Sequence, residues 1–225
     1  MASNLRVGVD VGGTNTDAVV MVGDAVVASV KVPTTDDVTG GILSALTELF
    51  SDTDLSPASI VAVMIGTTHF TNAVVEASGL TPTAVIRLGL PATSSLPPLV
   101  DWPHRLVQAI GNHAYMCRGG HEYDGREIAP LDHDGLQRIV EEAALAGVRS
   151  FAITSVFSPV NPEFEHEAAS IIKETVDGAS VSLSSEIGRI GLLERENATA
   201  MNACLIDLAN RIVHAFETAV TDFGI

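Results

Sequence analysis

The sequence has 225 residues, of which 46% are hydrophobic and only 4% aromatic, with 28 acidic against 12 basic side chains and a formal net charge of −16. This hydrophobic content supports a sizeable, mainly aliphatic core and excludes a disordered chain. A nucleic-acid-binding protein needs a basic surface, and no run of this sequence provides one, so we expect no nucleic-acid partner. Any bound phosphate must then be held by backbone N–H groups, hydroxyls and a metal ion.

The opening of the chain predicts a strand, a glycine loop and a hairpin. Residues 5–10 form an apolar strand that runs into the loop at 12–14. Two further apolar strands follow at 17–22 and 25–32, and the glycine–aspartate pair between them is typical of a tight hairpin turn.

Strands and helices alternate through the remainder of the chain. After a helix cap at Thr35, Asp36 and Asp37, we expect a helix over 42–50, strands at 60–65 and 83–88 with a helix from Phe70 between them, and a loop over 91–103. A strand at 115–118 and a turn at 123–126 follow. The rest of the chain is expected to form a helix over 134–146, a strand at 150–156, a helix over 162–176, a short strand near Val181 and a long helix over 192–220. This alternation predicts an α/β fold with parallel strands.

The two cysteines predict a reducing compartment. Cys117 and Cys204 are far apart and lack metal-ligand spacing, so we expect buried, reduced thiols. The N-terminus lacks the pattern of a signal peptide, and no stretch is long enough to cross a membrane. We therefore expect a cytoplasmic protein without a membrane partner.

The first motif, over residues 9–17, has the composition of a nucleotide-triphosphate site. Glycines at the end of a strand let the backbone approach phosphate oxygens and donate N–H groups, and nearby hydroxyls add donors. The candidate phosphate-binding residues are Gly12, Gly13, Thr14 and Thr16. Asp10 is placed to hold Mg²⁺, which needs few protein carboxylates, and Asp17 is placed to serve the same metal or to orient the loop.

Two well-known phosphate motifs do not account for this segment. No Gly-Lys-Ser/Thr follows, so it is not a Walker A loop, and a hairpin rather than a helix comes next, so it is not a dinucleotide fingerprint. The structural alternative is a Gly-Gly hairpin turn preceded by a solvated aspartate.

The second motif, over residues 65–76, follows another apolar strand. Thr67 and Thr68 end the strand and a helix begins directly after them, which leaves free N–H groups that bind anions or polarised carbonyls. The structural alternative is ordinary helix capping by Thr68. We expect Thr67, Thr68, Asn72 and His69 on the substrate side of a cleft.

The two motifs together resemble a known family. The opening loop and hairpin look like the phosphate element of the actin/hexokinase-type ATPase superfamily, in which two ribonuclease-H-like halves clamp ATP. The pair Asp-x-Gly-Gly-Thr-x-Thr-Asp at 10–17 and Gly-Thr-Thr-x-x-Thr-Asn-Ala at 66–73 is similar to the signatures of the hydantoinase A/5-oxoprolinase family. The likeness continues at 123–126, 157–162, 181–186, 194–199 and 202–203.

The resemblance implies a fold, a reaction and partners. It implies one ribonuclease-H-like half of a two-half ATPase, with a mixed sheet and flanking helices. The expected N-terminal domain spans 4–187, and 188–225 form a helix leading into a second half that this chain lacks, as a shortened chain or a naturally short form. It also implies ATP and Mg²⁺ as cofactors, a cyclic-amide substrate whose oxygen is phosphorylated before ring opening, and either a second hydantoinase subunit or a homo-oligomer.

The resemblance also implies roles for single residues. Asp10, Asp17, Thr67 and Thr68 would be catalytic, with Asp10 as the metal ligand, and Asn72 and His69 would contact substrate. Family members usually carry a small apolar residue where this chain has His69, so His69 retunes the pocket or fills space. Because the second half is absent, we expect this chain by itself to be inactive.

Three alternatives stay open. A carboxylase subunit related to the same family would need bicarbonate and partner chains. A small-molecule kinase of the same superfamily would share the first loop but would need an acidic base near residues 66–68, where there is none. A non-catalytic binding module is the third, and the short length favours it.

Overall fold

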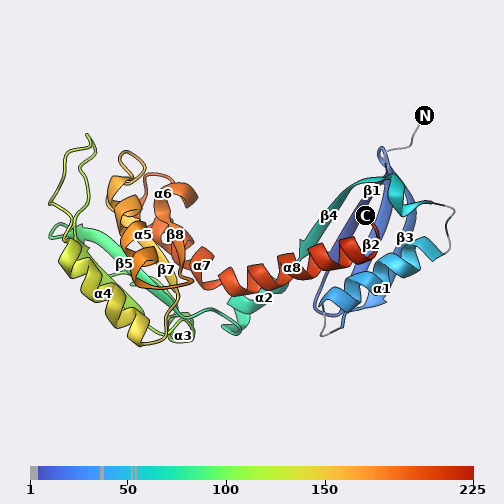
Figure 1. Ribbon diagram of the computed structural model, residues 1–225, viewed down its shortest axis with the longest axis horizontal. Helices are drawn as coiled ribbons and strands as arrows, with labels where there is room; N and C mark the ends of the chain where they lie inside the picture. The colour runs from blue at the N-terminus through green and yellow to red at the C-terminus, as the bar shows by residue number, and fades with distance from the viewer. Residues whose placement is uncertain (1–4, 36–37, 52, 54) are drawn as a thin grey trace. The chain divides into compact units, whose positions relative to one another are not determined.

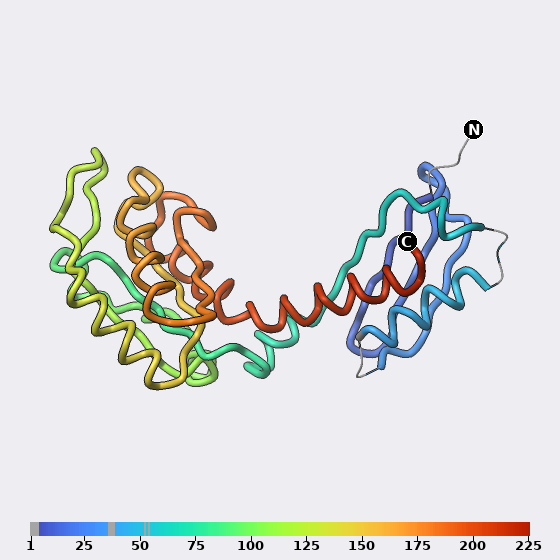
Figure 2. Tube along the Cα trace, viewed as in Figure 1, coloured from blue at the N-terminus to red at the C-terminus, as the bar shows by residue number. Residues whose placement is uncertain are grey.

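A computed structural model of the protein describes residues 5–35, 38–51, 53 and 55–225. The chain forms two compact units, which are coloured by residue number in Figures 1 and 2. Unit 1 consists of Met1–Glu76 and Leu208–Ile225, and unit 2 of Ala77–Asp207. Asp36 and Asp37, which we expected to cap the first helix, lie outside the described residues.

Unit 1 is built on a four-stranded mixed sheet. Its strands are β1 (Leu5–Val11), β2 (Asn15–Val22), β3 (Ala25–Pro33) and β4 (Ile60–Thr67), in the order β3-β2-β1-β4. β1 and β2 are antiparallel, as are β2 and β3, whereas β4 lies parallel to β1. The short 3-10 helix η1 (Pro57–Ser59) leads into β4, and α2 (His69–Glu76) follows it.

Only one face of this sheet is covered by helices of unit 1. Alternate residues of β1 are buried from Leu5 to Val11 and pack against α1 (Val38–Ser51). Phe216 and Ala219 of the last helix join this core, and the ring of Phe223 lies 5.4 Å from that of Phe50. The residues between the buried ones point to the opposite face, which we call the open face. It carries the exposed Asp10 and Met64, so the period-2 pattern gives the sheet a core side and a solvent side.

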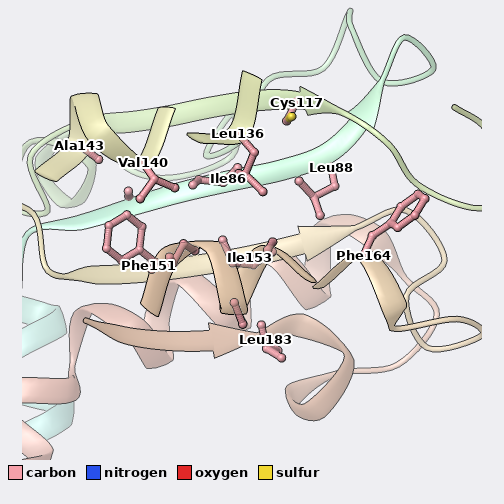
Figure 3. Packing of buried hydrophobic residues seen from close by; sticks show 14 of the residues in the cluster. Ile86, Leu88, Cys117, Leu136, Val140, Ala143, Phe151, Ile153, Phe164 and Leu183 are labelled. Carbon is pink, nitrogen blue, oxygen red and sulfur yellow. The ribbon is translucent and has the colours of Figure 1, made fainter. Parts of the chain in front are cut away.

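Unit 2 contains a parallel sheet buried on both sides. Its strands are β5 (Thr83–Leu90), β6 (His113–Arg118), β7 (Ser150–Ser155) and β8 (Ser180–Leu183), in the order β6-β5-β7-β8. α4 (His133–Leu145) and α5 (Glu163–Thr175) cover one face, where Figure 3 shows Leu136 and Val140 packed against Ile86 and Phe151. α7 (Leu192–Cys204) covers the other face. Double coverage explains why the residues of β7, and all but the last of β5, are buried on both faces of the sheet.

Buried charges in unit 2 hold elements together. Arg87 of β5 and Glu196 of α7 are both almost inaccessible, and the Arg87 Nε donates to Glu196 Oε2 at 2.7 Å. The Glu165 carboxylate accepts N–H groups of Ser155 and Ser185 at 2.8 and 2.9 Å. Because each of these charged groups has partners, we assign them a structural role: the Arg87–Glu196 pair joins β5 to α7, and Glu165 binds the end of β7 and the segment after β8.

The α/β fold expected from the sequence is confirmed, with three local differences. The helix expected over 192–220 is broken at Leu205 into α7 and α8 (Ile206–Asp222). At the break, the Cys204 carbonyl accepts the N–H of Thr81 at 2.7 Å and the Asp207 N–H donates to the Thr81 hydroxyl at 3.4 Å, so groups that would continue the helix are bonded elsewhere. The short helices α3 (His104–Ala109) and α6 (Ser184–Ile187) were not expected.

Cys117 and Cys204 are free, buried thiols, as expected. Burial raises the pKa of each thiol to about 11, so both are protonated near neutral pH. Within the described part of the chain, no helix has the length and apolar character needed to cross a membrane.

Replacing Glu196 by Ala should lower the free energy of unfolding of unit 2 by about 3–5 kcal/mol, because it leaves the Arg87 guanidinium buried without its counter-charge. Fluorescence of Trp102, the only tryptophan of the chain, reports on unit 2 in a denaturant titration. Arg126→Gln breaks the exposed pair with Asp124 and should leave the midpoint unchanged. An E196A transition that coincides with that of the wild type would contradict this role.

Candidate functional site

The loop between β1 and β2 presents backbone N–H groups to solvent. Its first residue, Gly12, donates its N–H to the Asn15 carbonyl at 3.0 Å, which closes a tight turn. A Cβ on Gly12 would lie 3.0 Å from the same carbonyl oxygen, a tight contact that favours glycine at this position. Gly13 and Thr14 are exposed. Among the described residues nothing accepts a hydrogen bond from their N–H groups, which are therefore free to bind an anion.

The hydroxyls of Thr34 and Thr16 support this loop through hydrogen bonds. The Thr34 hydroxyl donates to the Gly12 carbonyl at 2.9 Å, and the Thr34 N–H donates to the Thr14 carbonyl at 2.9 Å. The hydroxyls of Thr16 and Thr34 lie 3.1 Å apart. Because Thr34 donates its proton to Gly12, Thr16 must donate to Thr34.

Thr16 lies on the side of the sheet that α1 covers. It pairs with the buried Val11 and Val32, and its own exposed fraction is 0%. The structure therefore gives Thr16 a bracing role below the loop, and direct contact of its hydroxyl with phosphate stays a prediction. Sequence reasoning missed Thr34. The hairpin pairing could have found it, because antiparallel register places the end of β3 beside the start of β2.

Asp10 and Asp17 face each other across the β1–β2 pair. They are direct register partners on the open face. The same cross-strand row continues to Lys31 on β3 and to Gly66 on β4. Asp10 lies over Gly66, where a Cβ would be 3.3 Å from Asp10 Oδ1. The fold thus brings together two carboxylates that are seven residues apart in the sequence.

The second motif meets the first at this edge of the sheet. Thr67 pairs with Val11, and the Thr68 N–H points to the Val11 carbonyl at 3.4 Å. The Asn72 side chain lies against the glycine loop, since a Cβ on Gly13 would be 3.5 Å from Asn72 Nδ2. Parallel pairing of β1 and β4 places both strand ends, and the loops after them, side by side.

The hydroxyl that meets a backbone N–H at the start of α2 belongs to Thr67, not to Thr68. Thr67 Oγ1 accepts the N–H of His69 at 3.2 Å and lies 2.5 Å from His69 Nδ1. Thr68 is exposed, and no described residue is within hydrogen-bond distance of its hydroxyl. Thr68 is therefore free to contact a ligand, whereas Thr67 and His69 bind each other.

A shallow cavity of about 380 Å³ lies on the open face beside this edge. Its lining residues are Gly8, Val9, Asp10, Asp17, Val19, Met64, Ile65 and Gly66. Asp10 has no ion-pair or hydrogen-bond partner within the described ranges, and its carboxylate is of the kind that Mg²⁺ prefers. Gly13 and Thr14, whose N–H groups are free, follow Asp10 in the loop after β1, and together these groups have the chemistry that a metal-complexed phosphate needs.

Comparison with known families identifies the chain. The model of the hydantoinase/oxoprolinase N-terminal region matches residues 6–176, which include both motifs. The chain belongs to the hydantoinase/oxoprolinase family. The resemblance on which the sequence interpretation rested is thereby confirmed.

Relatives of this family member are longer proteins. Caprolactamase subunit alpha of Pseudomonas jessenii is 26% identical over 97% of the chain, and an uncharacterised protein of Methanocaldococcus jannaschii is 28% identical over all of it. In both comparisons the chain spans 34% of the relative's length.

Solved structures share the fold. A nucleotide-free acetone carboxylase, described with the mechanism of ATP-dependent acetone carboxylation, superimposes on 98% of the chain with a TM-score of 0.80 at 17% identity. The ATP-dependent caprolactamase of Pseudomonas jessenii superimposes on 97% with a TM-score of 0.76 at 21% identity. The chain covers 35% and 34% of these two structures.

Replacing Thr34 by Val should loosen the glycine loop, because it removes the hydroxyl that binds the Gly12 carbonyl, at a cost of about 1 kcal/mol. Hydrogen–deuterium exchange followed by NMR should show faster exchange of the Gly12 and Thr34 amides. Thr34→Ser keeps the hydroxyl and should exchange at the wild-type rate. Equal protection in both variants would mean that the loop keeps its shape without this bond.

Proposed function

We propose that this chain binds the phosphate groups of ATP at the loop between β1 and β2, as the N-terminal region of an ATP-dependent hydrolase of cyclic amides. The observation that carries the proposal is the exposed backbone of Gly13 and Thr14 next to Asp10, which has no partner among the described residues. Two proteins with the same fold are named as ATP-dependent, which supports the assignment.

The proposed chemistry is phosphoryl transfer to a lactam oxygen. A lactam is a poor electrophile, and moving the γ-phosphoryl group of ATP to its oxygen, with release of ADP, activates the carbonyl carbon. Water then adds to that carbon, the ring C–N bond breaks, and hydrolysis releases inorganic phosphate. The sum is the hydrolysis of one ATP and one amide bond, in which the protein mainly positions groups and stabilises charge.

Each motif has a place in this scheme. The N–H groups of Gly13 and Thr14 would donate to phosphate oxygens. Asp10 would hold Mg²⁺, which supplies neutralisation of phosphate charge when it is bound. Thr68 and Asn72 would contact the ring-bearing substrate.

Partner chains are part of the proposal. The relative from Pseudomonas jessenii is named as subunit alpha of a caprolactamase, which supports a second subunit for the active enzyme. The chain covers about a third of that relative, so we assign the activity to the assembly rather than to these 225 residues.

Phosphate binding can be tested on the chain itself. Mn²⁺·ATP should broaden the NMR signals of the Gly13 and Thr14 amides, because the paramagnetic ion would lie beside them. Asp10→Asn should weaken binding about tenfold, since a charged ligand group of this kind contributes on the order of 1–3 kcal/mol. Asp24→Asn, the same change in the exposed β2–β3 turn, is the control and should bind like the wild type. Broadening that D10N leaves intact would contradict the assignment.

The reaction requires the polypeptide of the native gene with any partner subunit. We expect ATP hydrolysis that depends on Mg²⁺ and on a ring from a panel of 5-oxoproline, hydantoins and caprolactam. Turnover should be lost in Asp10→Asn and retained in Asp24→Asn. ATP binding without stimulation by any ring would exclude the cyclic-amide assignment, and stimulation by a ketone with bicarbonate would favour a carboxylase of the same family.

A further inference from the structure

The candidate site contains a cation as well as two carboxylates. Lys31 of β3, one of only two lysines in the chain, extends across the open face to Asp17. Its Nζ lies 2.9 Å from Asp17 Oδ1 and 3.0 Å from Oδ2. The side chains of Lys31 and Asp17 are 62% and 43% exposed, so the pair is accessible from solvent.

The ion pair makes the two carboxylates electrostatically different. Asp17 is compensated by Lys31, whereas Asp10, its direct partner across the strands, has no cation near it within the described part of the chain. Like charges placed opposite each other in a sheet repel. The row Lys31–Asp17–Asp10 therefore carries a net charge of about −1 instead of −2.

Lys31 is the only cation of unit 1 in this row. The other Lys and Arg residues of unit 1 are Arg6 and Arg211. Arg6 donates to the Gly23 carbonyl, beyond the opposite end of β2, and Arg211 lies on α8. An anion that approaches Asp10 and the glycine loop thus meets Lys31 as the cation on the neighbouring strands.

We propose that Lys31 is a specificity-determining residue that makes this site select a metal–polyphosphate complex over a free divalent cation. The proposal rests on the proposed function, because it assumes that phosphate binds at the loop. With Lys31 present, one carboxylate is available to a cation, and the negative potential that would repel phosphate is lower. Without Lys31, two uncompensated carboxylates attract a bare divalent cation and repel a polyphosphate.

Loss of Lys31 should therefore change two affinities in opposite directions. In Lys31→Met, free Mn²⁺ should bind about fivefold more tightly and Mg·ATP about fivefold more weakly, the size of effect expected for one exposed charge pair. A residue with only a structural role would leave both affinities unchanged or weaken both.

The experiment measures free Mn²⁺ by electron paramagnetic resonance and Mg·ATP by calorimetry, with the same purified chain. Lys31→Arg keeps the charge and should match the wild type. Lys173→Met removes the only other lysine, on α5 of unit 2, and should also match. The double variant Asp17→Asn with Lys31→Met leaves Asp10 as the single carboxylate, and its Mn²⁺ affinity should return to the wild-type value.

The outcomes separate this inference from the proposed function. The assignment is supported if K31M binds Mn²⁺ more tightly and Mg·ATP more weakly than the wild type, and if adding D17N to K31M restores the wild-type Mn²⁺ affinity. Wild-type binding of Mg·ATP with no shift, or with parallel shifts, in K31M overturns the role of Lys31 and leaves the proposed function intact. A wild-type chain that binds no Mg·ATP, in contrast, overturns both.

Discussion

The candidate site depends on the antiparallel register between β1 and β2. The turn at Gly12 sets this register, because its N–H closes onto the Asn15 carbonyl and a Cβ there would crowd the same carbonyl. The register places Asp10 opposite Asp17 on the open face. A slip of one residue would send one of these carboxylates to the core side, because successive side chains of a strand point to opposite faces. The seven-residue spacing of the two aspartates and the geometry of the turn therefore depend on each other.

The two faces of the unit 1 sheet differ: one packs into the core, and the other carries the candidate site. Aliphatic side chains on the covered face pack against α1 and anchor the strands, and Thr16 and Thr34 extend this support to the loop. The open face carries charge and glycine in place of a second helix layer. Unit 2 differs in this respect, since both faces of its sheet are covered and its buried charges are paired internally. The exposed Asp10 of unit 1, in contrast, has no partner among the described residues.

The comparisons show the family and the fold of this chain but not its substrate. The family match covers both motifs, and the shared fold extends over nearly the whole chain. Neither comparison identifies a substrate, because relatives of this fold are named for both lactam hydrolysis and ketone carboxylation. The proposed phosphate site would serve either reaction, since both named proteins are ATP-dependent. In our proposal, selection between a ring and a ketone would come from groups near Thr68 and Asn72.

The sequence by itself determined the longer strands and helices, the α/β class, the two motifs and the residues that could carry charge or donate hydrogen bonds. These follow from local patterns: alternation in β1, short apolar stretches at 84–86 of β5 and 151–153 of β7, and glycine at a strand end. Only the tertiary structure decided that Lys31 pairs with Asp17, that Thr34 supports Gly12, that Thr16 faces the core and that the last helix breaks at Leu205. Each of these depends on a partner that is distant in the chain, such as Thr81 for the break. Periodicity shows which side of a strand is apolar, but the identity of the neighbour is set by strand pairing and packing.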